Sequence, residues 1–485
     1  MKQIATFALV VLVFCCDLAL MRAMAAPPNI IVVMADDHGQ WALGAYGLSA
    51  MQTPNLDWMA ERGVMFRNAM SPSPVCSPAR ASFYTGKMPS QHGVHDFLQE
   101  DAKYDHNWLA GETLLSEHLQ KEGYRTALIG KWHATTDSSI PQAGFDKWLS
   151  YDALKAGWRN QYLHRGTVKF SEDGNPTQYT GVQARFLTQQ AVDFIDQSSS
   201  KPFFISLNLV EPHAPFAGLP ERLVDHYRPI AGKIIRAGNS SDLPNLNKHT
   251  LVPDEHEEQL AQYLAAVSLI DEQVGTVLDA LEGRDLLDNT LLIYTSDHGM
   301  LMGQYGLYGK ANASYPPNFY EETIRIPLIF FGSEQLLRGH QSRGELVDLI
   351  DLHTTIRDIA SGGKHPKSDY GPGRSLRPLL NGERTLDWRR FQVSERGNAR
   401  MITDGHWKLV RYYSEDSTSQ PDDRWYDLSH PFAERHRSPT PRDQVRELLS
   451  SKLVQFFERY EVKGKSGRHF WSQPFPNAKT EKLMK

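Results

Sequence analysis

The chain has 485 residues, which is enough for one large domain with an appendage or for two medium-sized domains. Its composition, with 40% hydrophobic and 22% charged residues, is that of an ordinary soluble globular protein. The formal net charge of −5 provides no basic field of the kind that nucleic-acid binding requires, so nucleic acid is not an expected partner.

Residues 1–26 have the pattern of a secretory signal peptide. Lys2 precedes a mostly apolar run that continues to Leu20, and Ala23-Met24-Ala25 has the small-x-small pattern of a cleavage site. The alternative is a membrane anchor, but Asp17 interrupts the run and leaves it shorter than the roughly 20 apolar residues that a span needs. We therefore expect export to the periplasm or the medium, without stable membrane anchoring.

Cysteine use indicates a special role for one residue. Cys15 and Cys16 lie in the expected signal peptide, so the mature chain keeps only Cys76 and forms no internal disulfide. A single cysteine in an exported protein indicates a reactive or modified thiol. The alternative is a small buried hydrophobic residue, which is the commoner state of a free cysteine.

Four apolar runs are predicted to be buried strands of a parallel sheet, because their apolarity is continuous rather than alternating. The runs are Asn29 to Ala35, Arg125 to Gly130, Phe203 to Val210 and Leu291 to Ser296. A polar cluster follows each run. The clusters are Asp36-Asp37-His38, Lys131-Trp132-His133, Glu211-Pro212-His213 and Asp297-His298-Gly299. Ligands in such sheets bind beyond the carboxyl ends of the strands, so we expect the clusters to converge.

Helical patterns lie between these runs. They extend from Pro54 to Arg62, from Thr113 to Glu122 and from Glu257 to Leu281, and a glycine closely follows each one. Strands that alternate with helices predict an α/β domain with a large, doubly wound, mostly parallel sheet flanked by helices.

The pattern changes after about residue 380. Two strand-like segments, Ala399 to Thr403 and His406 to Tyr413, flank Asp404-Gly405, which is a two-residue hairpin signal. Another strand-like segment runs from Trp425 to Leu428, and a helix is predicted from Gln444 to Tyr460. The expected organisation is a signal peptide (1–26), a catalytic domain (27–380) and a smaller C-terminal α+β subdomain (381–485) with an antiparallel sheet and a helix.

The sequence SPVCSPAR around Cys76 is the most specific feature of the chain. Ser77 is predicted to cap a helix, Pro78 suits its first turn, and Gly86 ends it. Cys76 then lies at a helix N-terminus, where unpaired N–H groups and the helix dipole favour an anion. Arg80 follows four residues later on the same face. The residues alone therefore indicate an anion-binding reactive site.

The pattern Cys-x-Pro-x-Arg at Cys76 resembles the signature of the type I, formylglycine-dependent sulfatases, in the alkaline-phosphatase-like superfamily. The resemblance covers most of Pro27 to about Leu428 and includes all four polar clusters and Lys310. It implies that a formylglycine-generating maturation enzyme converts Cys76 to 3-oxoalanine. The hydrated aldehyde is a geminal diol: one hydroxyl attacks sulfur, and the other later loses its proton to expel sulfate.

The resemblance also implies one divalent cation at Cys76, with Asp36, Asp37, Asp297 and His298 as further ligands. Carboxylate oxygens suit Ca²⁺ or Mg²⁺ better than zinc, and Ca²⁺ is the expected ion. Many members of the family have asparagine in place of His298. The alternative is therefore that His298 orients a ligand by a hydrogen bond.

Five side chains have roles implied by the resemblance. Lys131 and Lys310 bind sulfate oxygens, and Arg80 holds the formylglycine. His133 assists the diol and the later elimination, while His213 protonates the leaving oxygen. Taken singly, each lysine or histidine is more often a surface charge or a turn residue. Weaker candidates for substrate contacts are His38, Trp41, His95, Asp96, Trp158 and Asn312.

The expected activity is hydrolysis of an organic sulfate ester. With 10% aromatic residues and tryptophans in expected loops, a sulfated polysaccharide or oligosaccharide is the favoured substrate, and a sulfated small molecule is the alternative. Two other functions stay open at this point. One is hydrolysis of a phosphonate or phosphate ester within the superfamily, and the other is noncatalytic binding of a sulfated glycan, against which the intact catalytic set argues.

Overall fold

The computed structural model describes residues 27–468, except for 101–105, 198, 236–241, 244–254, 366, 369, 417 and 431–432. The expected signal peptide, residues 1–26, lies outside the described residues. Within the described part, no helix combines the length and the apolarity that crossing a membrane requires.

A ten-stranded sheet forms the centre of the described part, in the order β12-β2-β11-β8-β1-β7-β3-β4-β5-β6. Its strands are β1 (Asn29–Ala35), β2 (Val64–Met70), β3 (Arg125–Gly130), β4 (Lys147–Tyr151), β5 (Arg165–Glu172), β6 (Asn175–Val182), β7 (Phe203–Asn208), β8 (Thr290–Ser296), β11 (Leu328–Phe331) and β12 (Gln341–Asp348). The four predicted strands are adjacent and parallel, in the order β8-β1-β7-β3. Their carboxyl ends therefore lie at one edge of the sheet.

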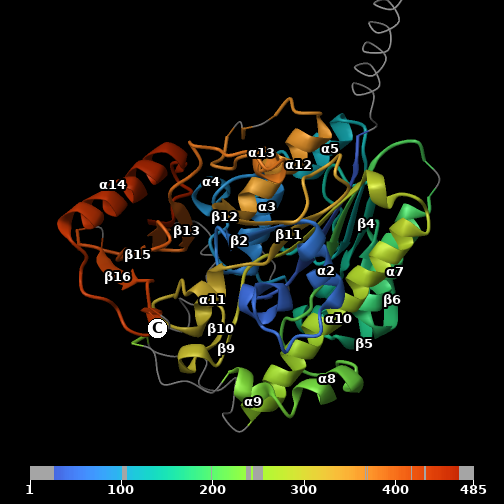
Figure 1. The fold of residues 1–485 in the computed structure, drawn as a ribbon, viewed down its shortest axis with the longest axis horizontal. Helices are drawn as coiled ribbons and strands as arrows, with labels where there is room; N and C mark the ends of the chain where they lie inside the picture. The colour runs from blue at the N-terminus through green and yellow to red at the C-terminus, as the bar shows by residue number, and fades with distance from the viewer. Residues whose placement is uncertain are drawn as a thin grey trace, which may run out of the picture.

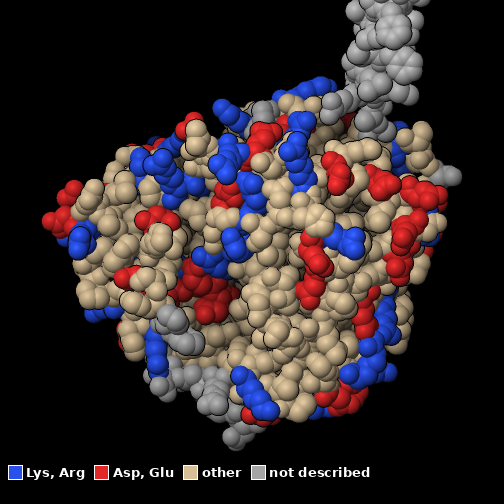
Figure 2. Space-filling view, viewed as in Figure 1, with Lys and Arg blue, Asp and Glu red and all other residues tan. Residues whose placement is uncertain are grey.

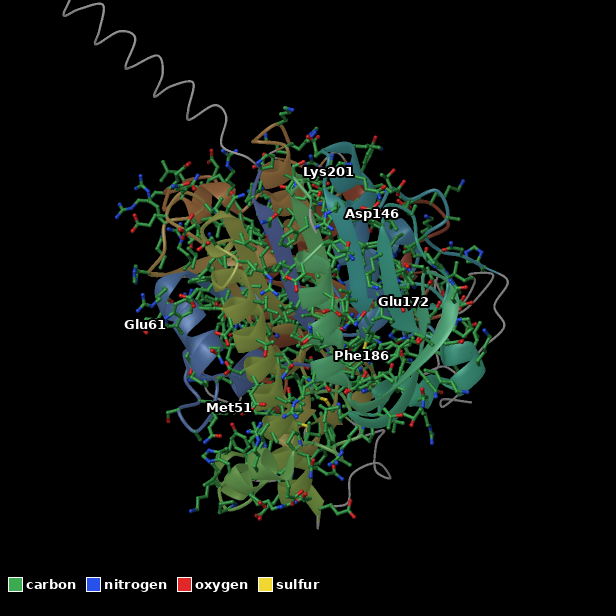
Figure 3. The ribbon with its side chains drawn as sticks, turned by 90° about the vertical axis from the view of Figure 1, so that its right-hand side faces the viewer. Met51, Glu61, Asp146, Glu172, Phe186 and Lys201 are labelled. Carbon is green, nitrogen blue, oxygen red and sulfur yellow. The ribbon has the colours of Figure 1, made fainter. Side chains whose placement is uncertain are left out.

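Helices cover both faces of this sheet, because successive side chains of a strand point to opposite sides. On one face, Ile31 and Val33 share a core with α2 (Pro54–Arg62), α7 (Gln183–Ile195) and α10 (His256–Glu282). On the other face, Ile30 and Val32 share a core with α3 (Cys76–Thr85), α5 (Leu115–Lys121) and α12 (Leu349–Ala360). Figure 1 shows this layered arrangement, and Figure 3 shows α7 and α10 side by side along one face. The prediction of a doubly wound sheet is confirmed, with antiparallel pairs at β11 and along β4-β5-β6.

A second sheet, antiparallel and four-stranded among the described residues, has the order β13-β14-β15-β16. Its strands are β13 (Gln392–Arg396), β14 (Ala399–Thr403), β15 (Trp407–Tyr412) and β16 (Asp422–Asp427), and α14 (Asp443–Tyr460) packs on it. The predicted sheet and helix are confirmed, and Figure 1 shows them at the left of the main sheet. The hairpin loop, however, has three residues rather than two, because the carboxylate of Asp404 accepts the N–H groups of His406 and Trp407.

The remaining α-helices and strands of the described part are short. They are α4 (Pro89–His92), α6 (Ala153–Ala156), α8 (Glu221–Tyr227), α9 (Ala231–Ile234), α11 (Glu321–Ile324), α13 (Arg377–Leu380), β9 (Leu301–Met302) and β10 (Tyr308–Gly309).

Candidate active site

The polar clusters after β1, β3, β7 and β8 converge near Cys76, as the sequence predicted. Cys76 is the first residue of α3, and its side chain is fully buried. Its Sγ lies 3.8 Å from Asp37 Oδ1 and 3.2 Å from His298 Nε2. Lys310, in the loop after β10, brings its Nζ to 3.0 Å from the same sulfur. Residues from distant parts of the chain thus surround one cysteine.

The start of α3 differs from the prediction at Ser77. The helix begins at Cys76 itself, and the residue before it, Val75, is extended and makes no side-chain cap. Ser77 Oγ instead accepts a hydrogen bond from the N–H of Leu98, at 3.0 Å, because Ser77 already lies inside the first turn. Cys76 therefore lies where the unpaired N–H groups of the helix gather, and the predicted position at a helix N-terminus is confirmed.

Three buried aspartates beside Cys76 are each paired with a cation. Arg80 Nε donates to Asp297 Oδ2 (2.8 Å), Lys131 Nζ donates to Asp36 Oδ2 (2.5 Å), and Lys310 Nζ donates to Asp37 Oδ1 (2.7 Å). Arg80 also donates from Nη1 to the carbonyl oxygen of Lys131, at 2.9 Å, which ties α3 to the end of β3. These paired charges form a network without an exposed carboxylate.

Burial and the cations act in opposite directions on the carboxyl groups. Burial raises the pKa of Asp36, but Lys131, His213 and Arg80 more than offset it and hold this pKa well below its usual range. Burial also raises the pKa of Asp37, but nearby positive charges, of which Lys310 is the strongest, outweigh it and lower this pKa below its usual value. Asp36 and Asp37 are therefore ionised at neutral pH.

The Cys76 thiol has the opposite behaviour. Burial raises its pKa above the ordinary thiol value, and the negative charge of Asp36 adds to this effect. An unmodified Cys76 is consequently a neutral thiol at neutral pH. Because the thiolate is the nucleophilic form of cysteine, the unmodified side chain is poorly suited to attack an ester.

The donor set around Cys76 fits a divalent cation. Asp36, Asp37, Cys76 and His298 each offer one ligand atom, and the four atoms lie within 4.8 Å of one another. Asp297 lies at the edge of this group, because its Oδ1 accepts the N–H groups of Asp37 (3.2 Å) and His298 (2.8 Å). The two carboxylates of this set supply the oxygen ligands that Ca²⁺ and Mg²⁺ prefer.

His213 lies at the open side of the cluster. Its Nε2 is 3.7 Å from Asp37 Oδ2, and its side chain is 13% exposed. Its Nδ1 donates to the carbonyl oxygen of Ala214, at 2.5 Å, so Nε2 carries no proton in the neutral ring. Burial lowers the pKa of His213 to about 4, although Asp37 acts in the other direction.

His133 lies deeper, behind Lys131. Its Nε2 donates to the carbonyl oxygen of Leu98 at 2.8 Å, while its buried Nδ1 has no hydrogen-bond partner in the described part of the chain. Burial, reinforced by Lys131, holds the pKa of His133 well below its usual range. The ring is therefore a neutral imidazole with one nitrogen free to accept a proton.

Two contributors to the site were not predicted from the sequence. Tyr162 ends a short 3-10 helix (Trp158–Tyr162), and its ring stacks on that of His213 with centroids 4.1 Å apart and planes at 11°. Lys131 Nζ lies 4.9 Å from the centroid of the same ring. His164 Nε2 donates to the carbonyl oxygen of His213, at 2.8 Å. No local motif marks either residue, since both act through packing and bonds to partners distant in sequence.

A pocket of about 460 Å³ opens beside the cluster. Its lining includes Asp37, His213 and Lys310, together with the weaker candidate Asn312. Of the other weaker candidates, His38 bonds to Tyr294 and Ala42, His95 to Lys465 and Asp96 to Arg396, while Trp41 stacks on Tyr263. The side chain of Trp158 lies outside the described part.

Comparison with known proteins yields a consistent result. A family model described as Sulfatase matches residues 28–362. The N-acetylglucosamine-6-O-sulfatase of Bacteroides thetaiotaomicron is 28% identical over 433 residues, covering 75% of this chain and 73% of that relative. The choline-sulfatase of Rhizobium meliloti is 28% identical over 421 residues, covering 79% and 78%. A solved structure in complex with its substrate D-glucosamine-2-N,6-O-disulfate has a TM-score of 0.75 at 23% identity and covers 93% of this chain and 100% of that one, so the fold is shared.

Proposed function

The chain belongs to the sulfatase family and is a hydrolase of sulfate esters, and we propose that it removes sulfate from a glycan through a formylglycine at Cys76 and one bound divalent cation. The observation that carries this proposal is the convergence of three cation-paired aspartates on a buried cysteine at a helix N-terminus. That arrangement combines a nucleophile position, hard metal ligands and fixed positive charges at one place.

The state of the Cys76 thiol supports its modification. A buried, neutral thiol is a weak nucleophile, whereas a hydrated aldehyde at the same position offers two hydroxyl groups. In the proposed reaction, one hydroxyl attacks sulfur and the ester oxygen departs with the bonding electrons. The second hydroxyl then loses its proton, the bond between the carbon and the sulfate oxygen breaks, and the aldehyde forms again. Conversion of Cys76 requires a formylglycine-generating maturation enzyme as a partner.

We assign the cation to Asp36, Asp37, Asp297, His298 and the modified Cys76, with Ca²⁺ preferred over Mg²⁺. When bound, the cation supplies positive charge that stabilises the sulfuryl oxygens and the nucleophile. Lys131 and Lys310 pair with Asp36 and Asp37, respectively. With a cation on those carboxylates, both ammonium groups would be available to sulfate oxygens, and Arg80 would keep its bond to Asp297 while it holds the nucleophile.

The two histidines are proposed to carry protons at different steps. His213 lines the pocket, so it lies on the side from which the leaving oxygen departs. Its Nε2 must gain a proton before it can donate one, and the negative charge of a bound sulfate ester favours that gain. We assign removal of the diol proton during elimination to the buried Nδ1 of His133, which has no hydrogen-bond partner among the described residues. The negative charge of the covalent sulfate would raise the lowered pKa of this ring and so favour the transfer.

A sulfated polysaccharide or oligosaccharide is the proposed substrate. The pocket combines the rings of Phe216 and Tyr308 with the amide groups of Gln259 and Asn312, a mixture that suits a sugar. A relative named for a sulfated amino sugar supports this choice, while a relative named for choline sulfate supports the small-molecule alternative. We also propose export after residue 26 and a boundary between the catalytic domain and the C-terminal subdomain near residue 380.

The decisive experiment concerns Cys76. The protein is expressed with and without a formylglycine-generating enzyme, and the mass of the peptide that contains Cys76 is compared with the rate of sulfate release. We expect activity only with the aldehyde mass, and we expect Cys76→Ala to lose at least about a thousandfold in kcat with an unchanged Tm, because a nucleophile is removed from a helix start. A tenth of wild-type activity in Cys76→Ala would refute the mechanism. Turnover of matched phosphate or phosphonate esters above that of sulfate esters would favour the alternative hydrolase, and tight glycan binding without turnover would indicate a binding protein.

A further inference from the structure

A second cleft, of about 400 Å³, lies between α14 and the loops that precede β13. Its floor is apolar and includes Met88, Ile350 and Val393, which belong to the core beneath the second sheet. It shares no lining residue with the pocket beside Cys76. Met88 lies just beyond the C-terminal end of α3, and Cys76 lies at the other end of that ten-residue helix, which is about 15 Å long. The cleft is therefore distinct from the active site.

Positive side chains stand on both walls of this cleft. Arg374 and Arg390 come from the loop side, and Lys452 and Arg459 come from α14. The α14 residues that line the cleft are Lys452, Gln455, Phe456, Arg459 and Tyr460, whose spacing places them on one face of the helix. Figure 2 shows Lys and Arg side chains gathered between the positions of α14 and α13 in the upper part of the view. The cleft is thus lined by positive charges from two separate segments of the chain.

These charges are not neutralised by the described part of the chain. Arg374 donates to the carbonyl oxygen of Asp387, Lys452 donates to Gln455, and Arg459 lies over the ring of Tyr460, but none of them forms an ion pair with a described carboxylate. Arg390 is exposed and likewise has no such partner. The fifth cation, Arg389, differs, because it binds both carboxylate oxygens of Asp351 at 2.6 and 2.8 Å.

The positive side chains of the two walls repel one another, and an anion bound between them would reduce this repulsion. One carboxylate, Asp348, is in the described lining, so the cleft keeps an excess of positive charge in a chain whose net charge is −5. The volume suits one or two sugar residues, and the rings of Phe391, Phe456 and Tyr460 provide apolar faces of the kind on which sugars stack. Guanidinium groups bind sulfate through paired N–H donors.

From this charge complementarity, we propose that the cleft between α14 and the 372–374 and 389–391 loops binds a sulfated stretch of a glycan chain, away from Cys76. The inference deepens the proposed function, on which it rests, because a remote anchor assists a polymer and cannot assist a small sulfate ester. It names the substrate class as sulfated polysaccharide. It also predicts that the C-terminal segment contributes to affinity for that polymer and makes no contribution to the chemical step.

The test measures binding of fluorescein-labelled dextran sulfate to the full-length protein by fluorescence anisotropy. The cleft variant is Arg390→Glu with Arg459→Glu, two exposed positions whose change leaves the fold intact. The matched control is Lys169→Glu with Lys201→Glu, which makes the same change in net charge at two exposed positions outside the cleft. Lys201 is labelled in Figure 3, which views the side of the molecule away from α14. Uncharged dextran and single-stranded DNA serve as comparison ligands.

We expect the cleft variant to bind dextran sulfate at least about tenfold more weakly than wild type, and the control variant to change Kd by less than about twofold. Neither variant should have a lower Tm than wild type, and both should keep the wild-type kcat/KM on p-nitrophenyl sulfate. Equal Kd values for cleft and control variants would overturn the proposal, whether both are unchanged or both are weakened. Tighter binding of DNA than of dextran sulfate through the cleft would overturn it in favour of a nucleic acid. The proposed function would fail in a different experiment, in which the protein releases no sulfate from any ester.

Discussion

Lys310 and His213 contact the same aspartate in different ways. Lys310 Nζ is 2.7 Å from Asp37 Oδ1, whereas His213 Nε2 is 3.7 Å from Oδ2 at the pocket side. A proton donor matters most when the departing alkoxide is a strong base, as a sugar alcohol is, and least for an activated phenol. His213→Ala should therefore slow a sugar sulfate at least about tenfold more than p-nitrophenyl sulfate, measured as kcat/KM.

Lys310→Ala is the comparison for this prediction. It should slow both esters to a similar degree, because the sulfuryl group that Lys310 is proposed to bind is common to them. Gln259→Ala, at the wall of the same pocket, controls for altered sugar binding. Equal slowing of both esters by His213→Ala would show that His213 binds sulfate or has a structural role. His133 would then be the next candidate for the proton donor.

The metal assignment predicts a difference between two adjacent residues. Chelation should abolish activity, and Ca²⁺ or Mg²⁺, rather than zinc, should restore it. Asp297→Ala should be more damaging than His298→Asn, because it removes a charge that faces the cation and also leaves Arg80 without its 2.8 Å partner. Asparagine at 298 still offers an oxygen ligand. Two measurements check this difference: bound calcium per chain, from atomic emission, and the rise in Tm on adding Ca²⁺. Both should be highest for wild type, lower for His298→Asn and lowest for Asp297→Ala.

Thoroughly metal-free protein with full activity would contradict this assignment. So would an Asp297→Ala variant that binds calcium as wild type does. Either result would leave the three aspartates as structural partners of Arg80, Lys131 and Lys310.

The candidate site was predicted from sequence to the extent that each residue followed a recognisable local pattern. The pairs Asp36-Asp37 and Asp297-His298 follow apolar runs. Because the carboxyl ends of parallel strands lie at one edge of a sheet, the sequence predicted that these pairs lie close together. Tyr162 follows no such run, and its stack on His213 depends on the path of a loop. Sequence likewise misassigned the cap at Ser77, because the bond from the Leu98 N–H comes from a distant segment.

At the level of elements, predictability depended on burial. Strands β1, β3, β7 and β8 are buried nearly throughout and appear as unbroken apolar runs. Strand β6, with the sequence NPTQYTGV, is exposed along much of its length and pairs with β5 alone at the end of the sheet. Its apolar signal is weak because most of its side chains are at least partly exposed, and Tyr179 and Val182, which pack against the core, are only partly buried. Such edge strands depend on pairing, which a single sequence does not display.

Helix α12 provides a pH prediction. Its N-cap, Asp348, accepts the N–H of Ile350 at 3.0 Å and is 6% exposed. Burial, reinforced by Asp351, raises the pKa of Asp348 to about 7, although Arg389 acts against the rise. A folded-state pKa above the unfolded value gives stability that is complete below the unfolded pKa and is lost as pH rises to the folded pKa. The contribution of Asp348 should therefore be lost between about pH 4 and about pH 7.

Asp348→Asn tests this directly, because asparagine keeps the capping oxygen and removes the charge. We expect the variant to be more stable than wild type at pH 8, by up to about 4 kcal/mol, and equal to it near pH 4. Urea unfolding at several pH values measures the difference. Asp348→Ala, which also removes the cap, should be less stable than Asp348→Asn at every pH. A constant difference between wild type and Asp348→Asn across the pH range would contradict the raised pKa.

At the scale of the whole described part, two smaller apolar cores join the second sheet to the main part. Met70 and Ile324 of the main part pack with Met401 and Val410 of the second sheet. A second core beneath α14 joins Met88 and Ile350 to the same sheet. The proposed boundary near residue 380 is therefore crossed by continuous packing, and we expect the described part to unfold as one unit.

Lys408 allows this cooperativity to be tested, because it is a fully buried charge on the second sheet that binds the main part. Its Nζ lies 2.5 Å from Glu434 Oε1 and 2.7 Å from Glu321 Oε1, and it donates to the carbonyl oxygen of Phe319 at 2.8 Å. Phe319 and Glu321 belong to the segment that follows Lys310 and leads into α11. Removing one partner of a buried ion pair leaves an uncompensated charge, which costs about 3 to 5 kcal/mol.

Lys408→Met should therefore destabilise the protein by about 3 kcal/mol or more, and Lys408→Met with Glu434→Gln should recover part of the loss, because the double change removes a stranded charge. Both variants should unfold in a single calorimetric transition in which activity and secondary structure are lost together, since the second sheet packs in cores that include Met70, Met88, Ile324 and Ile350 of the main part. If Lys408→Met produced an early transition that melted the second sheet while p-nitrophenyl sulfate hydrolysis continued, the C-terminal segment would be an independent unit. In that case the packing of Met401 and Val410 on the main part would not be what stabilises it.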